Sequence, residues 1–162
     1  MTNESLVKNE TSIKAYFEED HDRLDELFKN FQKFKLLDYP KAKEYFKEFK
    51  HGLQRHIIWE EDILFPVFEK KSNIPNGPTH VMRMEHRQIK ESLEAIHDKV
   101  KKQDPNSNDD EEKLLSILKS HNMKEEGILY PAIDSLIDET EKKSIFLSMR
   151  NIPQERFEKC CG

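Results

Sequence analysis

The stretch "HIIWEEDILFP" (residues 56–66) has a counterpart farther along the chain in "HNMKEEGILYP" (residues 121–131). Aligned without a gap from 56–68 onto 121–133, the two stretches share His, two Glu, Ile, Leu and Pro, six of thirteen positions. An aromatic residue also occupies the same place in both copies, Phe in the first and Tyr in the second. Internal similarity of this kind predicts that one structural unit occurs twice.

A further histidine precedes each copy at one fixed distance. His21 stands 35 residues before His56, and His86 stands 35 residues before His121. Both His21 and His86 follow an acidic residue, and each is followed three residues later by an aliphatic one. The whole pattern, a histidine and then HxxxE, therefore occurs twice, which indicates the duplication of a helical hairpin.

Length and composition fit one folded domain. The chain has 162 residues, of which 36% are charged and 35% hydrophobic, and Leu, Ile, Val and Phe together number 41. This is enough for a packed core. The net charge of −5, with both signs interspersed, argues against nucleic acid as a partner. No apolar run is long enough to span a membrane, and "MTNESLVKNE" has no signal-peptide core, so we expect a cytoplasmic protein.

Apolar residues recur at helical spacing along the chain, with almost no strand-like alternation. The first predicted helix contains residues 13–31 and ends near "LLDYP". The second runs from about Lys41 to "KKSNIPNGP", the third stops at "KKQDPNSNDD", and the fourth contains residues 114–129. Short linkers between long helices predict an all-α, up-down-up-down four-helix bundle, with "ETEKKSIFLSMRN" as a short C-terminal fifth helix. Pro66 and Pro131 should kink or end the helices in which they fall.

The predicted organisation has three parts. Residues 1–11 form a flexible N-terminus, residues 12–150 the bundle with its short fifth helix, and residues 151–162 a C-terminal tail. Cys160 and Cys161 are adjacent in that tail, where they supply no disulfide framework. An exposed tail is the expected reading of these two cysteines, with a redox-responsive or metal-binding thiol as the alternative.

The repeated polar residues should meet at one level of the bundle. Residues four apart on a helix share a face, so His56 lies beside Glu60 and His121 beside Glu125. Each histidine also lies at a similar distance from the nearest predicted turn as the histidine on the neighbouring helix, and equal distances mean equal heights in antiparallel helices. The side chains expected to converge are His21, His56, Glu60, His86, His121 and Glu125.

One buried histidine is most often a hydrogen-bonded core residue, and one HxxxE is most often a surface pair. Four imidazoles and two carboxylates in a dry core would be costly unless a cation pairs with them. Zinc normally takes four ligands, and calcium and magnesium prefer oxygen. Two transition-metal ions fit if both glutamates bridge, with an oxo or hydroxo bridge as fifth ligand and one position left open. The mixed nitrogen and oxygen set favours iron, with manganese or zinc as substitutes.

The remaining polar candidates are weaker. His80 suits a helix start, and His51 and His97 stand in highly charged surroundings typical of solvated residues. Glu61 and Glu126 follow the predicted ligands by one residue and should lie at the surface or support the ligands rather than bind metal. Ferritin-like sites use Glu-x-x-His pairs, whereas three of the four predicted ligand histidines have no Glu three residues before them. HExxH and Ser-His-Asp signatures are absent as well.

The motifs "HxxxEExxLFP" and "GPTHVMRMEH" resemble those of the hemerythrin-like (HHE cation-binding) family of non-haem di-iron proteins, over residues 12 to 133. The resemblance implies a four-helix bundle around an oxo-bridged di-iron pair that binds or turns over dioxygen, peroxide or nitric oxide. The six converging residues match the family's ligand pattern in the form H-HxxxE-H-HxxxE.

Two positions depart from an oxygen-carrying hemerythrin. Met82 stands where a carrier has a fifth histidine, and Glu126 stands where it has an aspartate, whereas the repeat selects Glu125. The pattern resembles the four-histidine, two-glutamate branch, which includes proteins implicated in iron-centre repair and other stress-related members. The repair proteins usually carry an N-terminal cysteine-bearing domain that this sequence does not show, so we do not expect a repair role.

Three functional hypotheses remain. The first is a redox or stress-response protein whose di-iron site reacts with dioxygen, peroxide or nitric oxide, in enzyme form a peroxide-consuming oxidoreductase of catalase or peroxidase type. The second is a non-catalytic module that binds or senses O2, NO or iron. The third is a purely structural bundle. The first two require a small-molecule ligand, and redox turnover also requires a reductant that the sequence does not identify.

Overall fold

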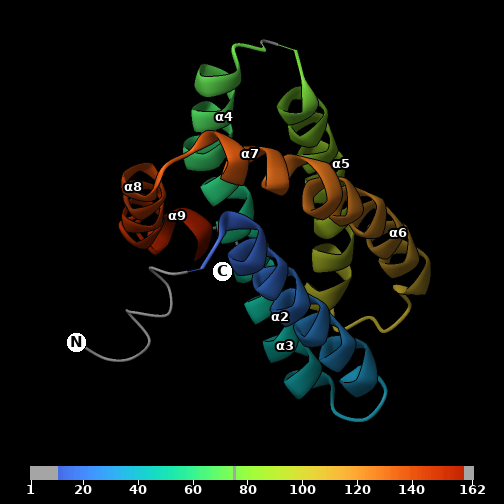
Figure 1. Ribbon diagram of the computed structural model, residues 1–162. Coiled ribbons are helices and arrows are strands. Elements are labelled where there is room, and N and C mark those ends of the chain that lie inside the picture. The colour runs from blue at the N-terminus through green and yellow to red at the C-terminus, as the bar shows by residue number, and fades with distance from the viewer. Residues whose placement is uncertain (1–10, 75, 159–162) are drawn as a thin grey trace.

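The computed structural model describes residues 11–74 and 76–158, and within these ranges all regular secondary structure is helical (Figure 1). The prediction of an all-α chain is therefore confirmed. Of the predicted flexible N-terminus, residues 1–10 lie outside the described ranges, as do Cys160 and Cys161 of the tail.

Long helical segments joined by short turns make up most of the fold. In chain order the elements are α2 (Ile13–Phe34), α3 (Tyr39–Ile58), η1 (Trp59–Leu64), α4 (Phe65–Ser72), α5 (Pro78–Lys101), α6 (Asn108–Lys124), η2 (Glu125–Leu129), α7 (Tyr130–Leu136), α8 (Glu139–Arg150) and α9 (Glu155–Glu158). Polar caps fix several helix starts: the side chains of Ser12 and Asp38 accept hydrogen bonds from backbone N–H groups in the first turns of α2 and α3. Asp138 and Glu141 form a reciprocal capping box at the start of α8.

The two repeated prolines do not end their helices. Each is preceded by a π-helical segment, η1 or η2, in which the backbone widens to an i→i−5 pattern: Phe65 N–H donates to Glu60 O, and Tyr130 N–H donates to Glu125 O. Pro66 and Pro131 have no N–H, so an α-helical hydrogen bond is missing there in any case, and the helix continues as α4 or α7. The predicted interruption thus takes the form of a wider turn in a continuous helix, and it begins at or beside the predicted ligand glutamate.

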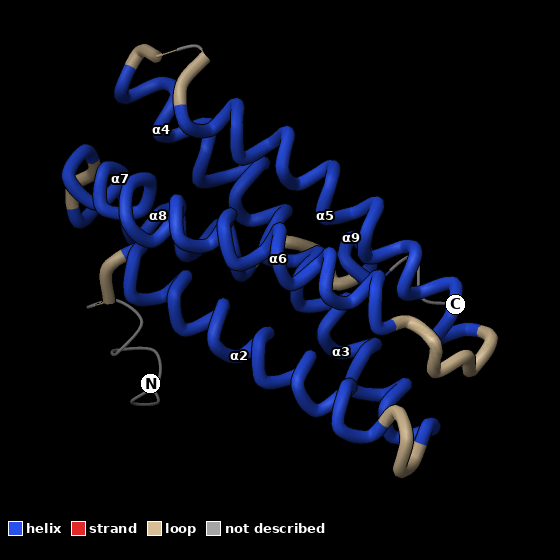
Figure 2. The backbone as a smooth tube through the Cα atoms, turned by 90° about the vertical axis from the view of Figure 1, so that its right-hand side faces the viewer, coloured by secondary structure: helices blue, strands red, loops and turns tan. Residues whose placement is uncertain are grey.

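The helices pack chiefly as two sequence-adjacent pairs, α2 with α3 and α5 with α6 (Figures 1 and 2). α7 crosses back to α2, and α8 packs against η1. Part of the predicted tail is ordered, because α9 packs against α3. There Arg156 forms an ion pair of 2.6 Å with Asp62, and Arg55 lies over the Phe157 ring.

Two hydrophobic clusters fill the interior. One is rich in Phe, with Phe28, Phe31, Phe46 and Phe49 from α2 and α3 packed against aliphatic residues of α5 and α6. The other gathers aromatic and aliphatic side chains from the opposite ends of these helices together with α7 and α8. The members of this second cluster are Ile13, Phe17, Trp59, Leu64, Phe65, Phe68, Met82, Leu129, Tyr130, Ile133, Ile145, Phe146 and Met149. A layer of buried polar side chains has neighbours in both clusters.

Candidate metal centre

The structure brings the six predicted ligand residues together. α2, α3, α5 and α6 each supply one histidine, and the π-helical segments η1 and η2 each supply one glutamate. None of the six is more than 4% exposed. Their donor atoms form two groups, each with all atoms within 4.8 Å of one another, and Glu125 belongs to both. The groups are Glu60, His86, His121 and Glu125, and His21, His56 and Glu125.

The four imidazole rings form two pairs. The rings of His21 and His56 are 4.7 Å apart between centroids, and those of His86 and His121 are 4.9 Å apart. We call these pairs the first half-site and the second half-site. The first half-site belongs to the α2–α3 hairpin and the second to the α5–α6 pair.

Each glutamate lies between the half-sites. Glu60 Oε1 is 3.6 Å from His56 Nε2 and 3.1 Å from His86 Nε2. Glu125 Oε1 is 3.3 Å from His21 Nε2 and 3.3 Å from His121 Nε2. Every glutamate therefore approaches one histidine of each pair, which is the placement expected of a carboxylate shared between two ions.

The opposite ring nitrogen of each histidine contacts a carboxylate outside this group. The four Nδ1–carboxylate contacts are His56–Asp20 and His121–Glu85, both 2.8 Å, and His86–Glu61 and His21–Glu126, both 2.7 Å. We call Asp20, Glu61, Glu85 and Glu126 the outer carboxylates. A carboxylate can only accept, so each Nδ1–H donates and the Nε2 lone pair faces the centre, which is the orientation a metal ion requires.

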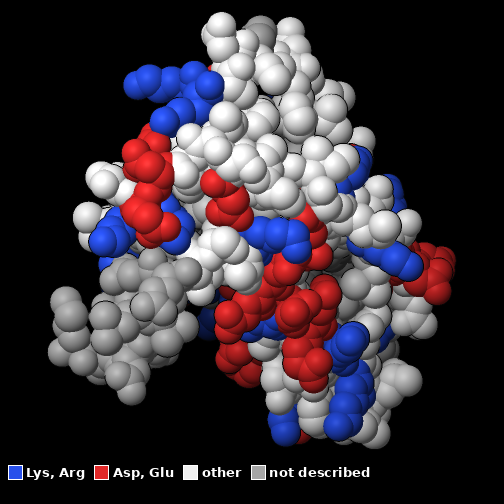
Figure 3. Space-filling model, viewed as in Figure 1, with Lys and Arg blue, Asp and Glu red and all other residues white. Residues whose placement is uncertain are grey.

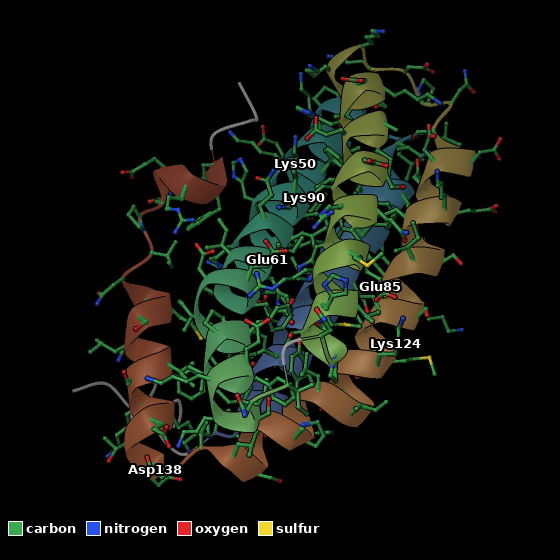
Figure 4. The ribbon with its side chains drawn as sticks, turned by 90° about the horizontal axis from the view of Figure 1, so that it is seen from above. Lys50, Glu61, Glu85, Lys90, Lys124 and Asp138 are labelled. Atoms are coloured by element: carbon green, nitrogen blue, oxygen red, sulfur yellow. The ribbon has the colours of Figure 1, made fainter. Side chains whose placement is uncertain are left out.

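Basic side chains form hydrogen bonds or ion pairs with two of the outer carboxylates. Arg23 donates to Asp20 at 3.0 Å, and Lys124 forms an ion pair with Glu85 (Figure 4). Asp20 is held ionised: burial opposes its charge, but the hydrogen bond and charge of His56 and the charge of Arg23 lower its pKa to about 2. Against burial, hydrogen bonds from the histidines and neighbouring cations also lower the pKa of Glu61 and of Glu85, so Asp20, Glu61 and Glu85 remain negative acceptors over the range in which the imidazoles would bind metal.

The electrostatics of the metal-free centre favour a positive charge. Burial opposes the protonation of His21, yet hydrogen bonds and charge from Glu125 and Glu126 raise its pKa to about 9. His86 shows the same balance, with Glu60 and Glu61 raising its pKa to about 9. The pKa of His121 is also raised, against burial, by Glu125. Protons therefore supply in the metal-free chain the positive charge that a metal ion would supply.

The pKa values of the two central glutamates are shifted in opposite directions. Burial and the negative charge of Glu125 raise the pKa of Glu60. Burial also opposes ionisation of Glu125, but hydrogen bonds from Glu60, His121 and His21 lower its pKa well below the ordinary value. Glu125 Oε2 is buried and has no hydrogen-bond partner. A buried carboxylate oxygen without a donor is costly, and a cation beside it would remove the cost, so the residues present fit a metal ion.

Tyr130 is the polar residue at the centre that the sequence pattern marked only as an aromatic. It is fully buried, and its hydroxyl lies 2.8 Å from Glu60 Oε2 and 3.0 Å from Glu125 Oε1. Phe65, its counterpart in the repeat, stacks on His86 at 5.8 Å. The signal available in the sequence was the substitution of Tyr for Phe inside an otherwise similar motif.

A small cavity of about 10 Å³ adjoins the six residues, which is about the space of one water molecule. A groove of about 420 Å³ lies between α2 and α6, and the two spaces share His21, Asp25, Leu118 and Asn122. Acidic side chains gather over α2 on the face shown in Figure 3, and Asp22 and Asp25 of that helix line the groove, with Lys29 and Lys119 also on its rim. The first half-site is thus the one nearer to solvent through the groove.

The other candidate residues fall outside the centre. His80 is exposed in the first turn of α5, and His51 lies near Glu158. The expectation that His97 is solvated is wrong: it is 7% exposed, because it packs beside Phe46 and its Nδ1 lies 2.8 Å from the buried Lys50 ammonium. Met82 is buried within the second hydrophobic cluster.

The described helices include none with the length and hydropathy needed to cross a bilayer. In comparisons with known proteins, no curated protein and no solved structure gives a significant match. A family model does match, that of the hemerythrin HHE cation-binding domain, over residues 12–133. The match covers most of the chain and the whole of the buried His and Glu cluster, and the protein belongs to the hemerythrin HHE cation-binding family.

Proposed function

We propose that this protein is an up-down-up-down four-helix bundle that holds a bridged pair of iron ions and reacts with dioxygen, peroxide or nitric oxide in a redox or stress-response role. The proposed metal ligands are His21, His56, Glu60, His86, His121 and Glu125. Manganese or zinc would be the competing metals for the same nitrogen and oxygen donors.

The observation that carries the proposal is the placement of each glutamate between the two histidine pairs. Glu60 and Glu125 each approach one histidine of the first half-site and one of the second. A single ion bound at one half-site would leave the two imidazoles of the other without a metal. The unpartnered Glu125 Oε2 adds independent support for a cation at the centre. When bound, iron supplies the electrons and the coordination positions that binding or reduction of a small oxygen or nitrogen species needs.

The surrounding chain favours small ligands. The cavity beside the six residues has room for a molecule about the size of water, and the groove between α2 and α6 gives a path toward it. Asp25 and Asn122 line both spaces, so they stand where a ligand would pass. O2, H2O2 and NO fit these dimensions, whereas a larger organic substrate would have to remain in the groove.

The first test is metal content. We expect the protein purified after growth in iron-replete medium to carry about two iron ions per chain, because four histidines and two shared glutamates supply enough donors for two ions. The metal should be measured together with helical content by circular dichroism. A fully helical protein that takes up neither iron nor a substitute metal would overturn the proposal.

The second test separates an enzyme from a binding module. The di-ferrous protein is mixed in stopped flow with O2, H2O2 and NO, and the lifetime of each product and the consumption of each reagent are followed. We expect prompt oxidation in air and measurable peroxide consumption, because Met82 is a thioether and a poor ligand for ferric iron, which would leave a position for a small ligand. An adduct that releases intact O2 under vacuum would instead support the non-catalytic alternative.

A variant at Met82 sharpens this test. We expect Met82→His to slow peroxide consumption, because an imidazole in this place would occupy a coordination position. Leu64→Met, within the same hydrophobic cluster but without a titratable group, serves as a control for altered packing. Unchanged peroxide consumption in Met82→His with full iron content would show that position 82 does not limit access to the metal.

A further inference from the structure

The hydroxyl oxygen of Tyr130 has more polar atoms around it than a single O–H hydrogen bond accounts for. Besides the two carboxylate oxygens, Tyr130 Oη lies 3.3 Å from His56 Nε2 and 3.4 Å from His21 Nε2. Four donor atoms of the proposed metal centre therefore surround one phenol oxygen in a fully buried setting. These four belong to the first half-site and to the two shared glutamates.

One proton cannot satisfy this arrangement. A phenol has a single O–H and can donate to one acceptor at a time. The Nδ1–H groups of His21 and His56 donate to Glu126 and Asp20, so the Nε2 atoms of both rings are the ones that face the phenol oxygen. Once a metal ion displaces the protons of these rings, five electron-rich atoms meet in one buried place, and the ion itself removes the repulsion among them.

The distances also suit a shared ion. Transition metals hold nitrogen and oxygen ligands at about 2.0–2.2 Å, which separates neighbouring ligands around one ion by about 2.8–3.4 Å. The four distances from Tyr130 Oη range from 2.8 to 3.4 Å. Tyr130 thus lies at the spacing of one more ligand in the same shell.

The two half-sites also differ in the number of protein donor atoms grouped around them. The second half-site and both glutamates give four donor atoms that all lie within 4.8 Å of one another, whereas the first half-site gives such a group of three with Glu125, and Glu60 Oε1 lies farther from His56 Nε2 (3.6 Å) than from His86 Nε2 (3.1 Å). Tyr130 lies on the side with three donors. On the other side Phe65 offers no donor atom, and its ring stacks flat on His86 with an interplanar angle of 10°.

We propose that Tyr130 is a seventh protein ligand, binding through its phenolate oxygen to the metal ion of the first half-site and making the two metal positions chemically unequal. This inference rests on the proposed function, since it needs a metal at the centre. On binding, the phenol O–H bond breaks, the oxygen–metal bond forms and the proton leaves to solvent, with no change in oxidation state. The metal in the first half-site then carries an anionic oxygen ligand that its neighbour does not have.

The test uses the ferric protein, because phenolate bound to ferric iron gives a visible charge-transfer absorption that neither histidine nor carboxylate ligands produce. We expect the native protein with about two ferric ions per chain to show this absorption and, under visible excitation, resonance-enhanced tyrosinate ring vibrations. Tyr130→Phe should keep the iron and the helical content but lose both signals. Tyr45→Phe, which changes a tyrosine packed on Phe34 away from the centre, should keep both signals.

Proton release on metal binding gives a second measurement. Loading metal-free protein with zinc at constant pH should release about one more proton per chain in the native protein than in Tyr130→Phe, since only the native chain loses the phenol proton. Equal proton release in the two proteins would contradict phenolate ligation. This measurement does not depend on the colour of iron.

The outcomes separate the two proposals. A native protein that binds no metal overturns the proposed function, and this inference with it. A native protein with both ferric ions but without tyrosinate vibrations overturns phenolate ligation alone and leaves Tyr130 as a hydrogen-bond donor to the glutamates. The native spectrum decides this even if the Tyr130→Phe variant fails to fold.

Discussion

The first and second half-sites are built from the same parts but differ in their aromatic neighbours. Both have two histidines, two outer carboxylates and two shared glutamates at equivalent positions of the repeat. The first half-site adjoins Phe17 and the Tyr130 hydroxyl, whereas the second adjoins the Phe65 ring. The two copies of the repeat thus share the groups that orient the imidazoles and differ in the aromatic groups beside them. Under the proposed function both halves would hold metal, and the aromatic positions would be the main source of a chemical distinction between them.

The largest expected effect comes from removing a shared glutamate. Glu60→Ala and Glu125→Ala should both reduce bound iron from about two ions per chain to less than about one, because each side chain approaches both half-sites. Iron content of purified protein measures the effect. Should Glu125→Ala keep its metal while Glu126→Ala loses it, the alignment of the repeat in the fourth helix would be wrong.

The outer carboxylates should have smaller, graded effects. Glu61→Gln and Glu126→Gln, like Asp20→Asn and Glu85→Gln, should keep two ions at saturating metal but weaken metal affinity by about 10–100-fold, because the acceptor that orients each imidazole loses its charge. Asp20→Asn should be the most damaging, since the Asp20 side chain is 9% exposed and that of Glu126 is 34% exposed. Competition with a chromogenic chelator gives the affinities. Equal losses of metal affinity in all four variants would show that the burial of an outer carboxylate does not determine how much it contributes to metal binding.

His21 and His86 should contribute similarly to the pH dependence of the metal-free protein. His21 and His86 have folded-state pKa values of about 9, above the ordinary value of 6.5. Their stabilisation is therefore fully present below about pH 6.5, and it is lost as the pH rises toward about 9. Each imidazole should contribute on the order of 1–2 kcal/mol to this loss.

Urea unfolding at about pH 6 and about pH 9.5 measures this difference in the free energy of unfolding. His21→Gln and His86→Gln should each remove a similar part of the pH dependence. Metal affinity should change in the opposite direction and rise with pH, because the ions displace protons from the same rings. A large effect from only one of the two variants would show that the half-sites are electrostatically unequal before metal binds.

The smallest effect is expected at a position where the two copies of the repeat differ but which is not a proposed metal ligand. Asp62 in the first copy corresponds to Gly127 in the second, and a Cβ at Gly127 would meet nothing within 4 Å. Gly127→Ala should therefore raise the free energy of unfolding by about 0.5–1 kcal/mol through the lower backbone entropy of the unfolded chain. Thermal unfolding measures the gain, and metal content should not change. A loss of metal would show that η2 needs the freedom of glycine.

The sequence predicted the helices and the convergence of six side chains because both follow from local periodicity. Apolar spacing identifies a helix, and equal distances from a turn place His21 beside His56 without any knowledge of packing. The partners of the Nδ1 atoms depend on how each helix is rotated about its axis, which periodicity does not give. The acid before His21 and the acid before His86 were visible in the sequence, but their contacts with His56 and His121 required the folded structure.

Burial of charged residues was the other part that the sequence did not give. His97 has charged neighbours along the chain, yet the fold encloses it with Lys50, whose ammonium is fully buried and forms an ion pair of 2.7 Å with Glu94. The prolines show the same limit in the backbone. A missing N–H predicts a break, but a π-helical segment precedes each proline and the helix continues beyond it as α4 or α7, whose residues pack in the second hydrophobic cluster.

The outer carboxylates connect the hairpins in a way that has a consequence for symmetry. Asp20 and Glu85 each serve a histidine of their own hairpin, whereas Glu61 and Glu126 each serve a histidine of the other. Each hairpin therefore supplies the other with the acceptor that it lacks, as two subunits do across an isologous twofold interface. The connection through residues 73–77 makes that association intramolecular and replaces protein concentration with a fixed effective concentration. The single chain is in this sense a dimer of hairpins that dilution cannot separate, and its covalent link is also what allows the two halves to carry different residues at positions 65 and 130.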